Sequence, residues 1–320
     1  MGRYIIRRLL QAIPLLFLVS IVVFILIHLI PGGAEAVFLN PKLTGAARQA
    51  IRHNLGLDQP IYLQYLLWIK GAVTGNFGNS FVDGQTVISD VGARVGPTIE
   101  LFGSALLLAL VLAIPLGITS AARQYSIVDY TITFLSYFGI SMPIFFFAII
   151  MQEIFAAQLG WLPDFGRSSD AVFTSPFDYF LDYLLHLILP MIVLSLAFMA
   201  GWSRYMRASM LDVKRQDYMR TARSKGLGPV AILVRHGMRN ALIPVLTVVA
   251  LDFGAIAGGA AVTETIFAWP GLGSFFIESL TGRDYPVLLA MLLMSAVVVI
   301  FFNLLADVLY GVLDPRIRYS

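Results

Sequence analysis

The sequence predicts an all-α membrane protein with about six transmembrane helices. Three observations support this fold class: the composition, the spacing of the apolar runs, and the uneven distribution of basic residues. Of the 320 residues, 58% are hydrophobic and only 13% are charged, and the mean hydropathy is +0.81. Soluble globular domains carry roughly 25% charged residues. Lipid rather than water must therefore solvate most of this surface.

Several classes of function are excluded by what the sequence lacks. It has no cysteine, which excludes disulfides, thiolate metal sites and cysteine nucleophiles. It has no G-x-x-x-x-G-K-[ST] phosphate loop, so ATP hydrolysis is not expected on this chain. The four histidines show no metal-ligand spacing, and no G-x-S-x-G motif occurs. We expect no enzyme activity, no metal and no cofactor on this chain, and no nucleic-acid partner despite the net charge of +3.

The first span is predicted at the N-terminus, where three arginines precede an apolar run from Leu9 to Ile30. A positive flank followed by an apolar run is also typical of a signal peptide. This run has 22 residues, however, whereas a signal-peptide core has roughly 7–15, and no small-residue cleavage site follows. Residues 1–30 are therefore interpreted as a short cytoplasmic segment and a retained transmembrane helix.

Five further runs have the roughly 20 apolar residues that a helix needs to cross a bilayer. They are Leu101–Ala122, Thr131–Gln152, Leu184–Ser203, Ala241–Thr263 and Pro286–Ala306. We expect neighbouring helices to accommodate the prolines in or beside these spans, which include Pro14, Pro115, Pro143 and Pro190. Residues 99–311 would then form a five-helix core, followed by a cytoplasmic tail at 312–320.

The basic residues predict the orientation. With six spans and a cytoplasmic N-terminus, the inside segments 1–8, 123–130, 204–240 and 307–320 hold 15 lysines and arginines. The short outside loops hold two, Arg167 and Arg283, and loops longer than about 60 residues contribute little to topology. Both termini are therefore expected in the cytoplasm.

The long outside loop, residues 31–98, is predicted to contain two helices. The first would cover Thr44 to Asn54, with Thr44 as N-cap and Gly56 just beyond its end. The second would begin after Pro60 and end near Gly75. The aromatic residues of the outside loops further predict an interfacial belt of Trp161, Tyr179, Tyr183, Trp269 and Tyr285.

The loop between the fourth and fifth spans, residues 204–240, is the most informative segment. It is basic and helix-forming, and Gly226-Leu227-Gly228-Pro229 interrupts it once. Glycine permits the positive φ of a sharp turn, and proline is favoured as the first residue of a helix. We predict a helix, a tight turn and a second helix that runs into the fifth span at Pro244. An ordinary positive-inside loop is the alternative. A helical elbow interrupted by one tight turn, however, is suited to transmitting a displacement from a soluble partner to the membrane helices.

This elbow carries a resemblance to a known family. Arg220-Thr221-Ala222, three residues, Gly226 and the later Ala241-Leu242-Ile243-Pro244 resemble the EAA signature of permease subunits of ABC importers. Two departures, Arg220-Thr221 in place of Glu-Ala and a longer Gly-to-Pro spacing, resemble the peptide-type branch.

The resemblance covers nearly the whole chain, because four further segments match in order: YIIRRLLQAIPLLFL, LGLDQPIYLQY…GNFGNSF, VTETIFAWPGLG and LADVLYGVLDPRIRY. Together the five are similar to the B-type permease of oligopeptide and dipeptide ABC importers. A single motif has a real false-positive risk, and five in order reduce it.

The resemblance implies a type I ABC importer permease in a prokaryotic cytoplasmic (inner) membrane. Its partners would be a homologous C-type permease, two ABC ATPase subunits, an extracytoplasmic substrate-binding protein and lipid. ATP and Mg would reside on the ATPase subunits, and the mechanism would be alternating access. Its substrates would be di- or oligopeptides, although relatives that carry nickel, glutathione, heme or opines share the motifs.

In that family the elbow contains the helix that docks into a groove on the ATPase subunit. The matched and neighbouring positions are Arg220, Thr221, Ala222, Arg223, Lys225 and Gly226. Ala222 would face the groove at close range and Gly226 would form the turn. Arg223 and Lys225 either pair with carboxylates of the ATPase or are solvated at the membrane surface.

Asp252 is the only charged residue inside a predicted span. Such a group is costly in a membrane and is a functional candidate by default. It either lines the translocation path or fastens neighbouring helices. The small residues that follow, including Gly254 and Gly258, form a Gly-x-x-x-Gly pattern that favours close helix packing.

Glu264 and the turn that contains Trp269 follow at the outer end of the fifth span. They are candidates for an outer gate or for a contact with the binding protein, and a simple belt and turn is the alternative. A secondary transporter would need several embedded coupling charges, and an intramembrane enzyme would need a nucleophile with a base or a metal set. Co-purification with an ATPase would separate these classes from an importer.

Overall fold

The computed structural model describes residues 2–29, 56, 58–169, 171–173, 175–258 and 260–313. In these ranges the chain is helical, and Asn79 and Thr86 form one isolated antiparallel bridge. Five helices are long and apolar enough to cross a membrane, or six if a bent pair forms one span. The prediction of an all-α membrane protein with about six spans is confirmed. The helix predicted at Thr44–Asn54 lies outside the described residues.

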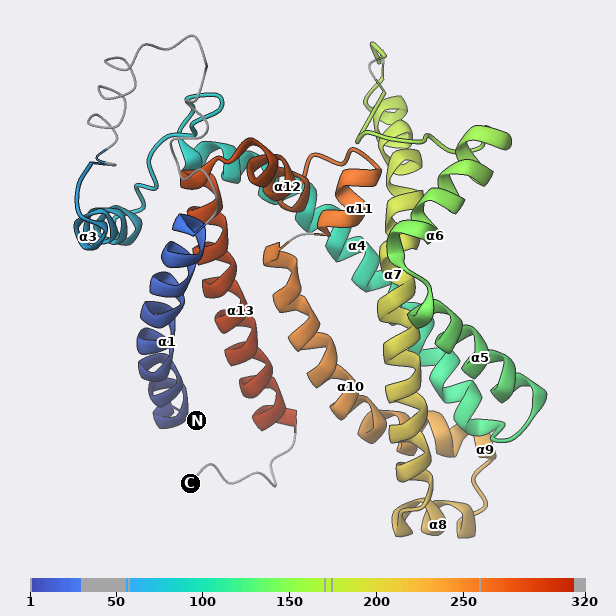
Figure 1. Cartoon of the computed structure of the whole chain (residues 1–320). Helices are drawn as coiled ribbons and strands as arrows, with labels where there is room; N and C mark the ends of the chain where they lie inside the picture. The colour runs from blue at the N-terminus through green and yellow to red at the C-terminus, as the bar shows by residue number, and fades with distance from the viewer. Residues whose placement is uncertain are drawn as a thin grey trace.

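The first and last helices, α1 (Gly2–His28) and α13 (Tyr285–Leu313), pack side by side (Figure 1). Their shared core lies near the end of the pair that is remote from both termini, which is the predicted outer end, and includes Phe24 and Leu288. At that end α3 (Ile61–Val73), the second predicted helix of the long loop, packs against α1. The Ser20 hydroxyl of α1 lies 2.8 Å from the Tyr65 hydroxyl of α3. The predicted helix between Pro60 and Gly75 is therefore confirmed.

The main core is built on α4 (Val87–Ala122) and α7 (Pro176–Lys214), which pack together over most of their lengths. They approach closely at Gly117, where an added Cβ would lie 2.5 Å from the Met206 Cβ and 2.7 Å from the Ser203 carbonyl oxygen. Only a residue without a side chain allows this contact, because interiors are already close-packed.

Both helices extend well beyond the spans predicted from hydropathy. At about 1.5 Å per residue, the 39 residues of α7 reach about 58 Å, far more than the hydrocarbon thickness of a bilayer. Hydropathy marks where lipid begins and ends, whereas a helix continues into water as long as its backbone bonds are made. Pro115 and Pro190 lie inside these helices, and Pro14 inside α1, as predicted.

The third span is not the continuous helix predicted over Thr131–Gln152. It consists of α5 (Ile127–Ser141), α6 (Ile144–Met151) and the π-helical η2 (Gln152–Gln158), with a 102° bend between Ser141 and Ile144. Met142, just before Pro143, is extended with ψ of 123°. A proline disfavours helical geometry in the preceding residue and removes a backbone donor. The span predicted over Thr131–Gln152 is therefore broken at Pro143 rather than continuous through it.

The fifth span is also irregular. The π-helix η3 (Ile232–Met238) leads into α10 (Arg239–Asp252), and a 3₁₀ helix, η4 (Phe253–Gly258), follows. Two short helices, α11 (Ala261–Ile266) and α12 (Leu272–Gly282), then return the chain to α13. The predicted span Ala241–Thr263 is therefore wrong beyond Asp252, where α-helical geometry stops. The glycines after Asp252 weaken helix propensity by roughly 1 kcal/mol each.

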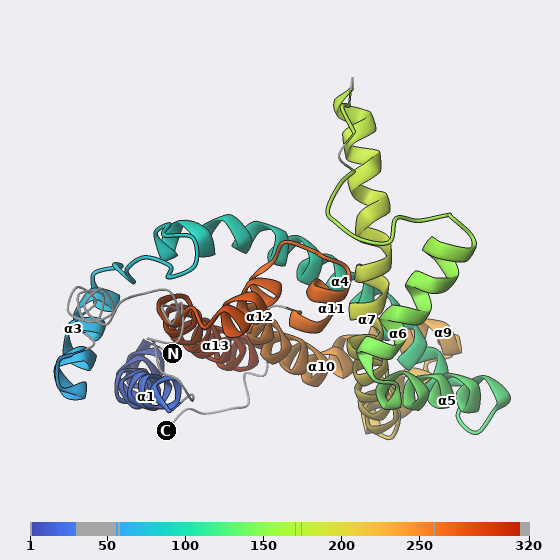
Figure 2. The ribbon, with the colours of Figure 1, turned by 45° about the horizontal axis from the view of Figure 1, so that its top comes forward.

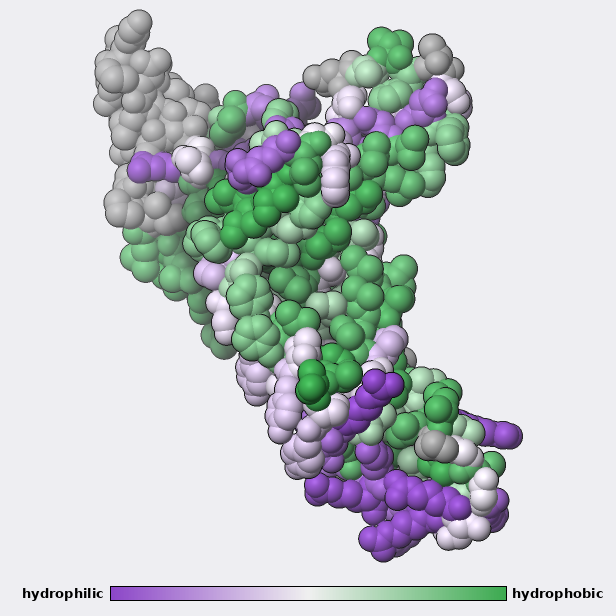
Figure 3. All heavy atoms as spheres, turned by 90° about the vertical axis from the view of Figure 1, so that its right-hand side faces the viewer, coloured by the Kyte–Doolittle hydropathy of each residue, from purple (hydrophilic) through white to green (hydrophobic). Residues whose placement is uncertain are grey.

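The membrane-facing surface is apolar, and the polar residues gather at its ends. In Figure 3 hydrophobic atoms dominate the middle of the view, and hydrophilic atoms gather at its lower end, around α8 (Asp217–Ser224). Two members of the predicted aromatic belt, Trp161 and Tyr179, are exposed. Trp269 and Tyr285 are 0% and 4% exposed, so the belt interpretation is wrong for them.

Candidate functional site

The elbow predicted in the loop 204–240 is present and lies beyond the end of α7. After Lys214 the chain turns at Arg215 and Gln216 into α8, which lies across the lower end of the molecule (Figure 1). Gly226 follows with a φ of +75°, and its N–H donates to the carbonyl of Arg223 at 3.0 Å. An added Cβ at Gly226 would meet nothing within 4 Å. The backbone conformation, rather than lack of space, is therefore what favours glycine at this turn.

α8 has one buried and one exposed face. Met219 and Ala222, three residues apart, are 0% and 7% exposed and belong to the main core. The other face carries Arg220, Thr221 and Arg223, and Lys225 and Gly226 follow the end of the helix; all five of these predicted coupling residues are exposed. The prediction that Ala222 faces a partner is therefore wrong. Its small side chain lets α8 lie close to the chain's own core, and the charged face points outward.

The elbow is fastened to the helices on either side of it. An added Cβ at Gly237 in η3 would lie 3.1 Å from the Met210 sulfur of α7 and 3.3 Å from the Met219 Cε of α8. The Asn240 amide donates to the Tyr218 hydroxyl at 2.9 Å, which joins α10 to α8. These contacts join α8 to α10 directly and to α7 through η3.

The polar end is rich in cations. Exposed basic residues of the elbow region are Arg215, Arg220, Arg223, Lys225, Arg235 and Arg239. An ion pair on α8 joins Arg220 Nη1 and Asp217 Oδ1 at 3.8 Å, and both side chains are largely exposed. An exposed pair of this kind holds its side chains only weakly. The surface therefore fits a partner with carboxylates, and pairing of Arg223 and Lys225 with an ATPase stays a prediction.

Asp252 is half-buried at the last residue of α10. Its Oδ2 accepts a 2.7 Å hydrogen bond from the Nε1 of Trp202, a fully buried residue of α7. The carboxylate thus fastens α10 to α7, and its remaining exposed surface is compatible with a path. Both predicted roles stay open.

The two glycines of the Gly-x-x-x-Gly pattern lie in η4, and η4 packs on α13. An added Cβ at Gly254 would lie 3.7 Å from Phe302 Cβ and from Val299 Cα, which is ordinary contact. Gly258 is the last residue of η4. The packing on α13 agrees with the predicted role at Gly254, but the contact is not one that only glycine allows.

Glu264 and Trp269 belong to a tightly closed turn between α11 and α12, and both are fully buried. The Glu264 carboxylate accepts hydrogen bonds from the Thr98 hydroxyl at 3.0 Å, from the Ser274 N–H at 2.9 Å and from the Ala260 N–H at 3.3 Å. The Trp269 indole donates to the Pro97 carbonyl at 2.8 Å. The turn is thereby joined to the outer half of α4.

This burial bears on the roles predicted for the turn. A fully buried side chain cannot contact a soluble protein, so the proposed contact between Glu264 or Trp269 and a binding protein is wrong for this conformation. A gate formed by the turn stays a prediction. Close packing explains the two glycines of the motif. An added Cβ at Gly271 would lie 2.4 Å from the Glu264 carboxylate, and one at Gly273 would lie 2.5 Å from Ala261 Cα.

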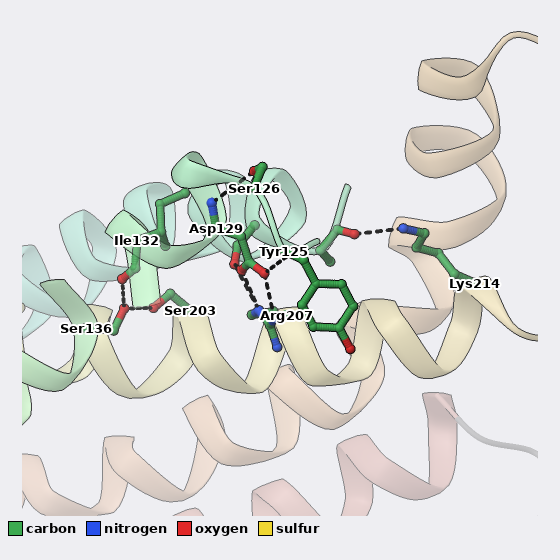
Figure 4. Close-up of polar contacts among 10 residues, drawn as sticks. Tyr125, Ser126, Asp129, Ile132, Ser136, Ser203, Arg207 and Lys214 are labelled. Carbon is green, nitrogen blue, oxygen red and sulfur yellow. Dashed lines mark hydrogen bonds and ion pairs between the residues drawn. The ribbon is translucent and has the colours of Figure 1, made fainter. Parts of the chain in front are cut away.

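A buried ion pair near the C-terminal end of α4 was not predicted from the sequence. Asp129, in the first turn of α5, is 1% exposed and accepts two hydrogen bonds from Arg207 of α7 (Figure 4). One signal was available: Asp129 is the only acidic residue in the short inner loop 123–130. A second pair that went unassigned joins Arg167 and Glu100 at the outer end, at 2.8 and 3.0 Å. In the described part of the chain no cluster of acidic residues and histidines could hold a metal ion.

Comparisons with known proteins place these features in a family. Residues 113–319 match the family described as binding-protein-dependent transport system inner membrane component, and residues 1–102 match the N-terminal region of that membrane component. The chain is 44% identical over 320 residues to the oligopeptide transport system permease protein AppB of Bacillus subtilis, with 100% of both chains covered. It is 41% identical over 330 residues to the dipeptide transport system permease protein DppB of Alkalihalophilus pseudofirmus, with 99% of both covered. It is 38% identical over 320 residues to the glutathione transport system permease protein GsiC of Escherichia coli K12, with 100% of both covered.

Proposed function

We propose that this chain, which belongs to the family of binding-protein-dependent transport system inner membrane components, forms part of a translocation path for di- or oligopeptides. It is a transmembrane permease of an ABC importer of the peptide or glutathione type, and it is a transport component rather than an enzyme. One observation supports peptides: relatives at 44% and 41% identity over the full length are named for oligopeptide and dipeptide transport. Glutathione is the second candidate, because a full-length relative at 38% identity carries that name.

The substrate is tested on the cognate binding protein and on the assembled transporter. Calorimetric titration of the binding protein with dipeptides, longer peptides, glutathione, nickel, heme and an opine identifies the class that binds. Uptake of the same compounds into proteoliposomes holding the complete complex then tests transport. Uptake of di- or oligopeptides with no competition from excess glutathione is expected. Uptake of glutathione alone would reject the peptide assignment.

The complex would contain a homologous C-type permease, two ATPase subunits that bind ATP and Mg, and an extracytoplasmic binding protein. The proposed division of this chain is a first span at 1–30, an outer helical loop at 31–98, a core at 99–311 containing the coupling loop 204–240, and a tail at 312–320. The described structure supports one point of the topology. The start of α1, the end of α13 and the elbow lie at the same end of the molecule (Figure 1), and Arg8 pairs with Asp307 there at 3.0 Å.

We place that end in the cytoplasm because 15 lysines and arginines fall in the inside segments. A reporter that is active only in the cytoplasm should be active when fused after Ser320 and inactive when inserted at Gly84 of the outer loop. The opposite pattern would put the elbow on the wrong side for an ATPase.

We propose that the exposed face of α8 is the ATPase-coupling surface. When the ATPase subunits close on ATP, they would displace α8. The contacts that join α8 to α10 and, through η3, to α7 would transmit this displacement to the transmembrane helices. The supporting observation is the division of α8: Met219 and Ala222 anchor it, whereas Arg220 and Arg223 are exposed. Coupling free energies between sites are typically 1–3 kcal/mol. Reversing two charges on this face should change the interaction with the ATPase by enough to abolish this coupling.

The test is the double variant Arg220→Glu/Arg223→Glu in the full complex. We expect the ATPase subunits to be lost from a pull-down and binding-protein-stimulated hydrolysis to fall. Lys70→Glu, an exposed change of the same sign on α3 at the other end of the molecule, is the matched control and should be silent. Normal ATPase association in the double variant would reject the coupling surface.

Asp252 is proposed to line the path as well as to fasten α10. Two variants separate these roles. Trp202→Phe removes the donor to Asp252 but keeps an aromatic ring and the carboxylate, whereas Asp252→Asn removes the charge and keeps the volume. If the charge faces substrate, uptake falls in Asp252→Asn and is largely kept in Trp202→Phe. Equal losses in both variants would leave helix fastening as the role of Asp252.

A further inference from the structure

The buried carboxylate of Asp129 gathers donors from three segments at the inner end of the molecule (Figure 4). Arg207 of α7 donates through Nε to Oδ1 and through Nη2 to Oδ2, both at 2.8 Å. The Ser120 hydroxyl of α4 donates to Oδ1, and the N–H of Tyr125 in the α4–α5 turn donates to Oδ2 at 2.9 Å. The Asp129 side chain is 2% exposed and the Arg207 side chain 28%. One carboxylate therefore joins α4, the turn, α5 and α7.

Further bonds along α7 join the same segments. Lys214 donates to the carbonyl of Ala121 at 2.7 Å, two turns below Arg207 and three residues before α8 begins. The hydroxyl groups of Ser136 in α5 and Ser203 in α7 lie 3.0 Å apart, one turn above Arg207. The inner end of α4, the start of α5 and the lower part of α7 are thus held to one another directly above the elbow.

α4 carries this attachment to the opposite end of the molecule. It is one continuous helix from Val87 to Ala122, and its outer half binds the closed turn through Thr98 and the carbonyl of Pro97. From Thr98 to Ser120 the helix rises about 33 Å at 1.5 Å per residue, which is the thickness of a bilayer core. Any tilt of the inner end of α4 therefore reaches the Glu264 turn.

We infer that Asp129 and Arg207 are positioning residues that lock the α4–α5 turn to α7, so that displacement of the elbow moves α4 and, through it, the outer turn. This inference rests on the proposed coupling surface of α8. The pair suits that task because two parallel N–H···O bonds fix the direction as well as the distance between two side chains. An apolar contact in the same place would hold α4 and α7 together but would let them slide.

The test uses Asp129→Leu/Arg207→Met in the full complex with its ATPases and binding protein. Replacing a buried ion pair by apolar side chains is often neutral for stability, so the complex should assemble. We expect ATPase association within about twofold of wild type and uptake per ATP hydrolysed to fall about tenfold, within the range of typical coupling factors. The chain has no native cysteine, so spin labels at Arg123→Cys and Lys225→Cys report the distance between the turn and the elbow. That distance distribution should broaden in the double variant.

The matched control is Arg94→Met/Glu278→Leu. It removes an ion pair of the same kind at the outer end of α4, where the contact is 3.4 Å and more exposed, and it should leave uptake per ATP unchanged. Unchanged uptake per ATP in Asp129→Leu/Arg207→Met would overturn the inference, as would loss of ATPase association, which would make the pair a folding or docking element. The proposed coupling surface is tested separately by Arg220→Glu/Arg223→Glu, so the two failures are distinguishable.

Discussion

Two buried carboxylates at opposite ends of α4, Asp129 at the inner end and Glu264 at the outer end, are held in different ways. Asp129 is bound by the guanidinium of Arg207, which belongs to another long helix. The donors to Glu264 in the described part of the chain are neutral: the hydroxyl of Thr98 in α4 and the backbone N–H groups of Ala260 and Ser274 in its own turn region. Gly271 and Gly273 bring that backbone close to the carboxylate.

This difference indicates which structural feature each carboxylate site maintains. A carboxylate held by its own turn stays bound as long as the turn is folded. The carboxylate of Glu264, a residue of α11, also lies against the N-terminal end of α12, where the Ser274 N–H and the helix dipole favour an anion. A carboxylate held by a side chain of another helix depends on how the two helices sit. The outer site therefore preserves a local shape, and the inner site preserves the register of α5 and α4 against α7.

The largest expected effect comes from breaking the inner pair on one side only. Asp129→Leu leaves the guanidinium of Arg207 without its carboxylate, and removing one partner of a buried pair costs roughly 3–5 kcal/mol. Thermal unfolding of the detergent-solubilised protein should show this loss. Asp129→Leu/Arg207→Met should recover most of the stability. Equal stabilities of the single and double variants would show that the two side chains are not energetically coupled.

The second effect tests how tightly the backbone at Gly271 packs against the Glu264 carboxylate. In Gly271→Ala the new methyl group would lie 2.4 Å from the Glu264 carboxylate, and overpacking a tight site costs about 3 kcal/mol at the upper end of the usual range. The same thermal unfolding assay measures it. Gly103→Ala in α4 is the control, because its Cβ would meet nothing within 4 Å, and stability should stay the same or rise slightly. An unaffected Gly271→Ala would contradict the closed turn.

The third effect tests whether neutral donors suffice for a buried carboxylate. Glu264→Gln keeps the shape but replaces one acceptor oxygen by an NH₂ group, which then faces a backbone or hydroxyl donor. A buried donor left unpaired in this way costs about 2 kcal/mol. We expect a smaller loss than in Asp129→Leu, measured in the same unfolding series. A larger loss would reverse the ranking of the two sites.

The smallest effect separates the strain of a left-handed backbone conformation from the cost of steric crowding. Gly226 has open surroundings but a φ of +75°, so Gly226→Ala should cost only the strain of left-handed geometry, about 1 kcal/mol. Gly228→Ala, two residues on, also has open surroundings and no positive φ, and should be neutral. A loss at Gly226 as large as at Gly271 would mean that the elbow is more tightly packed than the structure shows.

Much of the architecture could be predicted from the sequence because the deciding interactions are local. A run of about 20 apolar side chains favours lipid wherever it lies in the chain, so the number and approximate position of the spans followed from composition alone. The turn of the elbow was predicted for the same reason: Gly226 and Pro229 bias their own backbone angles. The motifs that resemble peptide-type permeases were also local strings of sequence, and they agree with the family that the comparisons identify.

Only the tertiary structure decided which way particular side chains face and where helices stop. Pro115 lies inside the continuous helix α4, whereas Pro143 stands at the break between α5 and α6, because neighbouring segments determine whether the freed backbone groups find partners. Ala222 is buried in the main core of its own chain rather than on the exposed face of α8. The Trp269 side chain is buried rather than exposed because the carbonyl of Pro97, 172 positions earlier in the chain, accepts a hydrogen bond from its indole N–H. Asp129 and Arg207 meet across 78 positions, and no local preference of either residue encodes that contact, since its energy exists only when α5 and α7 are packed.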